Sequence, residues 1–209
     1  MLKIELMHFY KIIFVLLIMF TNSKLFSYEE GIALNGDLEI YYRDYGPKDA
    51  EPILLVQGIG GQLINWPEHL IDFLLENNFR PIVYDNRDTG LSSRIPSDSF
   101  SDAKRDNTIV KNYIRYYLRL PIKSDYTLDD MAVDGVSVLD KLDISEAHIL
   151  GVSMGGMIAQ IIVSSHPERT KTFTLISSTA STPSPFNGPT RKVRKLLMNR
   201  TKNPNSTVD

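Results

Sequence analysis

Four short apolar runs, separated by segments of helical periodicity, constrain the fold of this chain more than any other feature. They are residues 52–57, 80–85, 147–151 and 172–177. The apolar residues follow one another without alternation, which indicates strands buried on both faces, as in a parallel sheet. From residue 53 the order is therefore strand, helix, strand, helix, strand, helix, strand. This order predicts an α/β fold with a doubly wound, mostly parallel sheet.

Three segments between the runs have the marks of helices. They extend from Pro67 to Asn78, from Thr127 to Leu142 and over residues 157–165. Proline is favoured in a first helical turn, where Pro67 stands. The carboxylate of Asp130, three residues after Thr127, completes a capping-box pattern, and apolar residues follow at helical spacing. Pro167 ends the third helix, because proline lacks the N–H that a helix needs.

The sequence around these runs predicts further elements. Asn-Gly at residues 35–36 lies between two short runs within residues 31–45, which is a strong β-hairpin signal. Residues 96–126 are polar, and only Val110–Leu120 favours a helix. The fourth run would leave an exposed apolar edge on the sheet. After it, one amphipathic helix begins near Pro189.

Residues 1–27 predict a signal peptide or an N-terminal anchor. Lys3 and Lys11 precede the apolar residues 12–20. A membrane-spanning helix needs about 20 apolar residues, so this run better suits the core of a signal peptide. Ser23 and Ser27 offer cleavage sites, and an uncleaved anchor or an unusual buried strand are the alternatives. We expect an exported protein, periplasmic or secreted, or one that contacts the membrane only through this segment.

The composition limits the kinds of active site and the binding partners that the chain can have. A chain of 209 residues suits one domain with a sizeable core. Its net charge of −2 gives no strong positive field, so nucleic acid is not an expected partner. The chain has no cysteine, which excludes disulfides, cysteine-bound metals and a thiol nucleophile.

The strongest motif is Gly-Val-Ser-Met-Gly at residues 151–155, which fits G-x-S-x-G. Its place between a buried strand and a helix is that of a nucleophile elbow, where a sharp bend lifts the hydroxyl of Ser153 above the sheet. One alternative is a glycine-rich turn used only for packing. A dinucleotide-binding turn would need glycine at position 153 and an acid after the next strand, where Ser177 and Ser178 stand.

A second motif, Gln-Gly-Ile-Gly-Gly at residues 57–61, follows the first buried strand. Acyl transfer needs two N–H groups at the point where the carbonyl oxygen becomes negative. One comes from the residue after the nucleophile, Met154, and the other from a loop after an earlier strand. Ile59 is the candidate for the second donor, and a plain strand-to-helix loop is the alternative reading.

These two motifs, with Tyr-Asp-Asn-Arg-Asp-Thr-Gly-Leu-Ser at residues 84–92, resemble the α/β-hydrolases, and among them the aclacinomycin methylesterase-like carboxylesterases. The resemblance covers about residues 31–179. It implies that Ser153 is the nucleophile and that Ile59 and Met154 donate to the oxyanion. It also implies a small-molecule ester or acyl substrate, with no metal and no organic cofactor.

The resemblance also implies where the parts of the chain begin and end. Residues 28–180 would form the N-terminal part of the hydrolase core, and residues 181–209 the start of a lid. Three residues of the third motif are expected to shape a loop beside the pocket without acting in catalysis; they are Asp85, Arg87 and Gly90. Gln57 departs from the family, in which His-Gly is the commoner start, but a backbone donor does not depend on that side chain.

A catalytic base and acid for Ser153 are not evident. The family order is serine, acid, histidine, and only His166 follows Ser153. His166 lies 13 positions along the same helix, roughly 20 Å away, whereas a base must lie within about 3 Å. Of the other histidines, His69 precedes the motif, and His148 opens a strand at the far end. We therefore expect the C-terminal part of the fold, which would bring both partners, to be missing.

Three functions agree with these observations. The first is a serine hydrolase of carboxylic esters, present here as a truncated copy. The second is a non-catalytic fragment or a binding module that retains the hydrolase pocket. The third is different chemistry on the same fold, such as peracid formation or carbon–carbon bond cleavage, because a fold does not determine a reaction.

Overall fold

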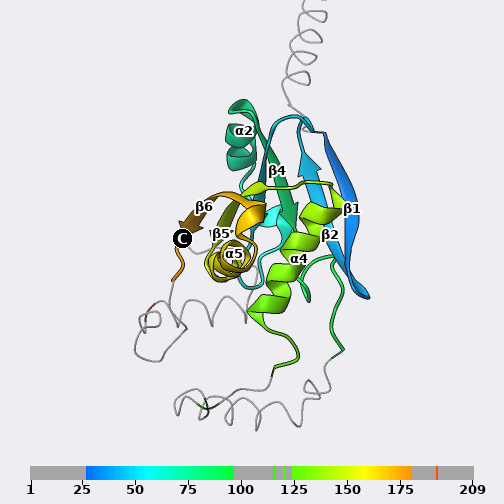
Figure 1. Cartoon of the computed structure of the whole chain (residues 1–209), viewed down its shortest axis with the longest axis vertical. Coiled ribbons are helices and arrows are strands. Elements are labelled where there is room, and N and C mark those ends of the chain that lie inside the picture. Colours follow the sequence, from blue (N-terminus) through cyan, green and yellow to red (C-terminus); the bar gives the residue numbers. More distant parts are fainter. Residues whose placement is uncertain (1–26, 97–114, 116–119, 121–123, 180–191, 193–209) are drawn as a thin grey trace, which may run out of the picture.

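The computed structural model describes residues 27–96, 115, 120, 124–179 and 192 (Figure 1). Within them the strands are β1 Tyr28–Asn35, β2 Leu38–Tyr45, β3 Glu51–Val56, β4 Phe79–Tyr84, β5 Ala147–Val152 and β6 Thr170–Ile176. The helices are α2 Glu68–Glu76, α4 Leu128–Lys141 and α5 Met154–Ser165, with short 3-10 turns η1 Leu63–Asn65 and η3 Pro167–Arg169.

The described strands form one sheet in the order β1-β2-β4-β3-β5-β6. Strands β4, β3, β5 and β6 run parallel, and β2 joins β4 antiparallel. Leu54 at the centre of β3 pairs with Ile82 on one side and with Ile149 on the other. The α/β fold with a mostly parallel, doubly wound sheet is therefore confirmed.

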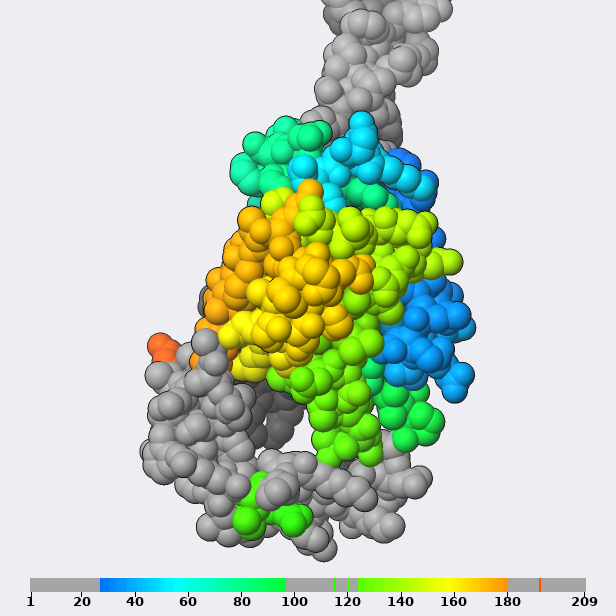
Figure 2. Space-filling view, viewed as in Figure 1, coloured from blue at the N-terminus to red at the C-terminus, as the bar shows by residue number. Residues whose placement is uncertain are grey.

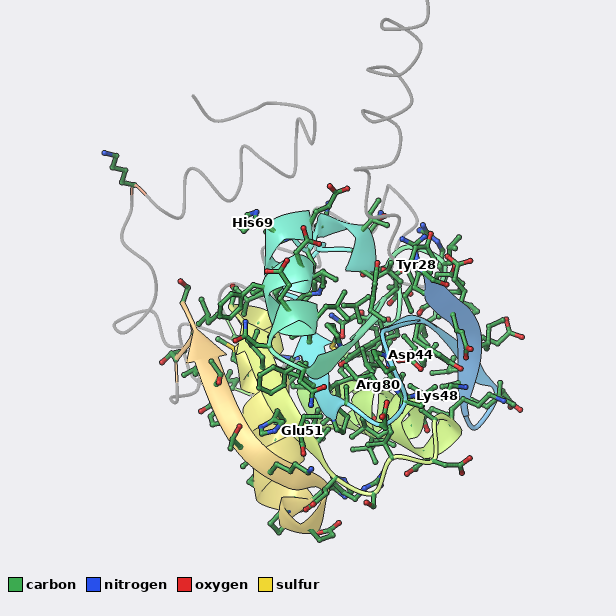
Figure 3. The ribbon with its side chains drawn as sticks, turned by 90° about the horizontal axis from the view of Figure 1, so that it is seen from above. Tyr28, Asp44, Lys48, Glu51, His69 and Arg80 are labelled. Atoms are coloured by element: carbon green, nitrogen blue, oxygen red, sulfur yellow. The ribbon has the colours of Figure 1, made fainter. Side chains whose placement is uncertain are left out.

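The predicted hairpin is also confirmed. Strands β1 and β2 pair from Tyr28 with Tyr45 to Asn35 with Leu38, and Gly36 in the turn has a φ of 60°. The hairpin is joined to the parallel strands by a buried ion pair, in which Arg80 of β4 donates to both carboxylate oxygens of Asp44 at 2.8 and 2.6 Å (Figure 3). A bidentate pair satisfies both charges inside the sheet, so burial there is tolerated.

Side chains from alternate strand positions enter two cores, one on each face of the sheet. On one face, Leu54, Ile82 and Ile149 pack against the apolar faces of α4 and α5. Figure 2 shows the outside of this layer, where α4 and α5 lie side by side next to the hairpin. On the other face, Leu55 and Val83 pack against α2 and η1.

The first residues of α4 and α5 follow from the residues at each helix N-terminus. At the start of α4 the Thr127 hydroxyl accepts from Asp130 N–H at 3.3 Å, and the Asp130 carboxylate accepts from Thr127 N–H at 2.7 Å. This reciprocal contact confirms the predicted capping box. Helix α5 begins at Met154, three residues before the predicted start, because Gly155 and Gly156 lie in the helix itself.

The exposure of strand β6 differs from the burial predicted for the fourth apolar run. It pairs with β5 only and forms the last strand of the described sheet. Phe173, Leu175 and Ile176 keep 38–41% of their surface exposed. The prediction that this strand is buried on both faces was therefore wrong for the described structure, whereas the expected exposed apolar edge is confirmed.

Several expected elements lie outside the described residues. They are the leader segment up to Phe26, almost all of the 110–120 helix, and the segment beyond Thr179 expected to start a lid. Among the residues that are described, no helix has the length and apolar character needed to span a membrane.

Candidate active site

Ser153 lies between β5 and α5 on a backbone that few residues adopt. Its φ of 57° and ψ of −121° are strained for a residue with a Cβ atom. Its N–H donates to the carbonyl of Ile176 at 2.9 Å, and its carbonyl accepts from Gly156 N–H at 3.0 Å. The side chain is exposed. The bend thus presents a hydroxyl to solvent at a helix N-terminus, where the helix dipole favours negative charge.

The bend requires glycine because backbone from three elements meets there. A Cβ atom on Gly155 would stand 2.1 Å from the carbonyl oxygen of Val56 and 2.5 Å from that of Gln57. A Cβ atom on Gly151 would stand 2.3 Å from the Gly155 carbonyl oxygen. Neither contact can be relieved by a side-chain rotation, because the neighbouring atoms belong to the backbone. Gly155 therefore lets α5 approach the end of β3, and Gly151 lets the first turn of α5 lie against the end of β5.

The loop after β3 lies directly against Ser153. A Cβ atom on Gly58 would stand 3.1 Å from Ser153 Cβ and 3.6 Å from Ser153 Oγ. The loop is a tight turn, in which Gly61 N–H donates to the Gly58 carbonyl at 3.1 Å. The Gln57 side-chain oxygen accepts from Gly58 N–H at 3.1 Å and so supports the turn. The structure thus brings the second motif and the serine motif together.

The two predicted oxyanion donors come from the two sides of this contact. Ile59 forms the exposed corner of the turn, and Met154 is the first residue of α5. No described residue accepts a hydrogen bond from the N–H of Ile59. The N–H of a first helical residue has no partner within its own helix. Their positions agree with the expected role, which stays a prediction.

Asp85, just after β4, ties two loops of the site together. Its carboxylate accepts from Leu63 N–H at 2.7 Å and from Leu91 N–H at 2.9 Å. Gly90 is required beside it, because a Cβ atom there would stand 1.9 Å from the Asp85 carboxylate. The nearby Ser92 hydroxyl donates to the Asp85 carbonyl at 2.6 Å. This buried acid acts as a connector between loops.

Arg87 connects the same loop to α4. It donates to both carboxylate oxygens of Asp134, at 2.6 and 2.7 Å, and to the carbonyl of Asp130 at 2.9 Å. Asn35 of β1 donates to the same carboxylate at 2.8 Å. The Asp134 side chain is fully buried, and its hydrogen bond with Arg87 raises the pKa of the guanidinium further. The ion pair therefore anchors the loop after β4 to α4.

A tyrosine covers this anchor. The ring of Tyr126 lies 5.3 Å from the guanidinium carbon of Arg87, within the range of a cation–π contact. Burial, together with a hydrogen bond to Asp88, raises the pKa of Tyr126 to about 12. The phenol therefore stays protonated at neutral pH and contributes no charge to the loop.

Two of the described histidines, His148 and His166, form contacts away from Ser153. The Nδ1 atom of His148 lies 2.7 Å from the Thr172 hydroxyl, at the opposite end of β5, and His166 at the end of α5 lies 3.8 Å from Glu168. His69 points outward from α2 in Figure 3. The described residues also hold no group of three or more His, Cys, Asp or Glu side chains placed to bind a metal ion.

Sequence reasoning missed three contributors to this region. Gly58 touches the serine, Asn86 donates to the carbonyl of Gln57 at 3.1 Å, and Asp134 holds Arg87. Gly58 and Asn86 stand within the motifs at residues 57–61 and 84–92, but no individual role was assigned to either. Asp134 carried a signal of another kind, since it is an acid three residues from Met131 on the apolar face of a predicted helix. An acid at such a position needs a buried partner.

The comparisons with known proteins agree with this geometry. The sequence profile of the alpha/beta hydrolase fold matches residues 51–208, which include every loop of the site. The chain belongs to the α/β-hydrolase fold family. The strained serine, the glycine turn and the Asp85 connector all lie within the matched region.

Two relatives illustrate the range of the family. Rhodomycin D methylesterase DnrP of Streptomyces peucetius is 30% identical over 158 residues, which are 76% of this chain and 41% of the methylesterase. The putative carbamate hydrolase RutD of Variovorax paradoxus is 27% identical over 141 residues, which are 68% of this chain and 43% of that protein. This chain thus spans less than half the length of both relatives.

Solved structures show the same fold. Est816, described as an N-acyl homoserine lactone degrading enzyme, superposes with a TM-score of 0.53 at 25% identity over 71% of this chain and 45% of that one. The 2-hydroxy-6-oxo-6-phenylhexa-2,4-dienoate hydrolase from Rhodococcus sp. strain RHA1 superposes with a TM-score of 0.60 at 19% identity over 86% of this chain and 55% of that one. The second likeness concerns the fold alone.

Proposed function

We propose that this chain carries the nucleophile and oxyanion-binding part of a serine hydrolase that acts on carboxylic esters. The observation that carries the proposal is the strained, exposed Ser153 at the N-terminus of α5, with Gly58 of the β3 loop against it. In this proposal the backbone N–H groups of Ile59 and Met154 bind the carbonyl oxygen of the substrate. This is the arrangement that an acyl-transfer site needs.

In the proposed reaction, Ser153 Oγ attacks the ester carbonyl carbon, and the carbonyl oxygen becomes negative between the N–H groups of Ile59 and Met154. The bond to the alcohol then breaks, and the alcohol leaves with the serine proton. Water hydrolyses the resulting acyl-enzyme and releases the acid. Both steps need a base within about 3 Å of the transferred proton.

No described histidine lies in that position, and the chain spans 41% of the methylesterase relative. We propose that these 209 residues correspond to the N-terminal part of a longer hydrolase, whose base and acid come from its C-terminal part. The same observation favours the second candidate, a protein that retains the pocket without turnover. We expect this chain alone to hydrolyse esters near the background rate.

Covalent labelling tests the nucleophile. The chain is incubated with phenylmethylsulfonyl fluoride, and the modified peptide is identified by mass spectrometry. We expect the label on Ser153, slowly in this chain and rapidly in a full-length relative with the same elbow. Ser153→Ala should abolish labelling, whereas Ser165→Ala, an exposed serine at the other end of α5, should not. No label on Ser153 in either protein would contradict the proposal.

An ester hydrolysis assay separates the two candidates. Turnover of p-nitrophenyl acetate that Ser153→Ala abolishes would show that these residues suffice for catalysis, against our expectation. Labelling without turnover would support an incomplete hydrolase. Neither labelling nor turnover would favour the binding module.

A further inference from the structure

The peptide bond between Gln57 and Gly58, in the loop after β3, has both of its polar groups bound inside the protein. Its carbonyl oxygen, that of Gln57, accepts from the side-chain amide of Asn86 at 3.1 Å. Its N–H, that of Gly58, donates to the side-chain oxygen of Gln57 at 3.1 Å. The orientation of this peptide is therefore held at both ends.

This peptide lies next to the candidate nucleophile. A Cβ atom on Gly58 would stand 3.1 Å from Ser153 Cβ and 3.2 Å from the carbonyl oxygen of Val152. A Cβ atom on Gly155, in the first turn of α5, would stand 2.5 Å from the carbonyl oxygen of Gln57. The 57–58 peptide is thus packed between the serine bend and the start of α5.

The N–H group that follows this peptide belongs to Ile59, the predicted oxyanion donor of the loop. Among the residues that the structure describes, none accepts a hydrogen bond from it. Gly58, which stands between the two peptides, has no Cβ atom and allows a wide range of backbone angles. The direction of the Ile59 N–H therefore depends on how the 57–58 peptide is held.

Asn86 is placed to hold this peptide because its own position is fixed. It lies just after β4, is only 2% exposed, and its backbone carbonyl accepts from Thr89 N–H at 3.0 Å. A carbonyl oxygen cannot donate, so the side-chain atom that faces Gln57 must be the amide nitrogen.

The side-chain oxygen of Asn86 shows which part of the amide is useful. It is buried and has no hydrogen-bond partner among the described residues. Burial of such an oxygen costs free energy, and an apolar side chain of the same shape would avoid that cost. The favourable group of Asn86 is therefore the N–H that binds the Gln57 carbonyl.

We propose that Asn86 is a positioning residue for the oxyanion-binding loop, because its amide holds the 57–58 peptide and so keeps the Ile59 N–H available to the substrate. The inference rests on the proposed role of Ser153 as the nucleophile. In this role Asn86 contacts neither the substrate nor the serine hydroxyl, and it acts through the peptide alone. Loss of one oxyanion donor lowers the rate of acyl transfer roughly 100-fold or more, so loss of its positioning should remove a measurable part of that factor.

The rate at which a fluorophosphonate labels Ser153 tests the effect on the reaction, because the phosphoryl oxygen becomes more negative as the serine attacks. The rate is measured at about pH 9, where hydroxide can take the serine proton in this chain. Asn86→Leu keeps the branched shape and removes the N–H, and we expect labelling to be roughly tenfold slower. Asn86→Asp cannot donate when it is ionised and should slow labelling similarly, so it decides the question if Asn86→Leu fails to fold.

The matched control is Asn77→Leu. The side-chain amide of Asn77 also donates to a backbone carbonyl, that of Phe73 at 2.8 Å, but it does so at the end of α2. This variant removes the same kind of hydrogen bond and should be labelled at the rate of the unchanged chain.

Amide hydrogen exchange, measured by NMR, reports on the loop without any reaction. We expect the Gly58 N–H to exchange severalfold faster in Asn86→Leu than in the unchanged chain, because the peptide is no longer held at its carbonyl. In Asn77→Leu the Gly58 rate should stay the same. The melting temperature of Asn86→Leu should change little, since the lost hydrogen bond is offset by removal of the unpartnered oxygen.

The outcomes distinguish the two proposals. If Ser153 is labelled in none of these proteins, nor in a full-length relative, but Gly58 exchanges faster in Asn86→Leu, the proposed nucleophile fails and the hold of Asn86 on the peptide stands. If the unchanged chain and Asn86→Leu are labelled at equal rates, the positioning role is overturned and the nucleophile stands. Equal slowing in Asn86→Leu and Asn77→Leu, or an unchanged Gly58 exchange rate in Asn86→Leu, would also overturn the positioning role.

Discussion

At their carboxyl ends, β3, β4 and β5 lead into turns that depend on close backbone contact and buried charge, whereas the amino ends of β3 and β6 are joined by an ion pair at the surface. The first end holds the strained Ser153, Gly155 against the carbonyl of Val56, and Arg87 bonded to Asp134. The second end holds Glu51 of β3, which lies 2.5 Å from Lys171 of β6.

The difference shows which end of the sheet contributes more to the free energy of unfolding. A surface ion pair is screened by water and contributes little to stability. Removal of one partner of a buried ion pair is strongly destabilising, because the other charge stays buried without compensation. The carboxyl end therefore tolerates few substitutions, because it must hold a strained hydroxyl in place. The amino end only has to keep neighbouring strands aligned.

Removal of the buried cation should have the largest effect. Arg87→Leu leaves the fully buried Asp134 carboxylate without its counter-charge, so we expect the free energy of unfolding to fall by roughly 4 kcal/mol. Urea denaturation measures this loss. In the double variant Arg87→Leu, Asp134→Leu, where no charge stays buried, most of the loss should be recovered. An equal loss in both variants would show that shape, and not charge, is decisive.

Gly155→Ala should follow, with a loss of roughly 3 kcal/mol, because its Cβ atom would collide with two backbone carbonyls and push α5 away from β3. Labelling of Ser153 should be lost with it. Gly60→Ala is the control, since its Cβ atom has open space and meets only the cost of a φ of 68°, about 1 kcal/mol. Similar losses in the two variants would contradict the role given to backbone contact.

Arg169→Ala tests a largely covered contact next to the amino end of β6. Arg169 donates to the carbonyls of Ile144 and Ser145, both at 2.8 Å, and pairs with Asp140 at 2.7 Å. Its side chain is largely covered, so we expect a loss of about 2 kcal/mol in thermal or urea unfolding. The conservative variant Arg169→Lys should recover only part of it, because lysine cannot donate in the same fork. A loss larger than that of Arg87→Leu would reverse the comparison.

Glu51→Gln should have the smallest effect. The hydrogen bond from Lys171, and then its charge, lower the pKa of Glu51 below its ordinary value of 4.5. The folded protein therefore holds this proton less tightly than the unfolded chain, and the small stabilisation is present above pH 4.5 and lost as the pH falls below it. The difference in melting temperature between the two proteins should disappear at acidic pH and at high salt. A difference that grows on acidification would be the wrong sign.

Much of the fold was predictable because its signals are local. Each apolar run is shorter than eight residues and carries its own strand pattern, and Asn35-Gly36 specifies a tight turn without outside help. The G-x-S-x-G motif with its flanking strand and helix predicted the bend at Ser153, since the glycines and the strain belong to one short segment. Helix α4 was predictable from Thr127 and Asp130 for the same reason.

Other features were not predictable, because they depend on residues far apart in the chain. The pairing of Arg87 with Asp134 spans 47 positions, and that of Asn35 with Asp134 spans 99. The exposure of β6 depends on what lies beside it, and its apolar residues look the same in a central strand and in an edge strand.

The sequence by itself determined the kinds of element, the turn chemistry and the candidate nucleophile, because propensity, periodicity and glycine placement act over a few residues. Only the tertiary structure decided that Gly58 lies against Ser153 and that Asp85 joins two loops. Those contacts arise where separate strands end side by side, and the free energy of packing, not local preference, selects which residues meet there.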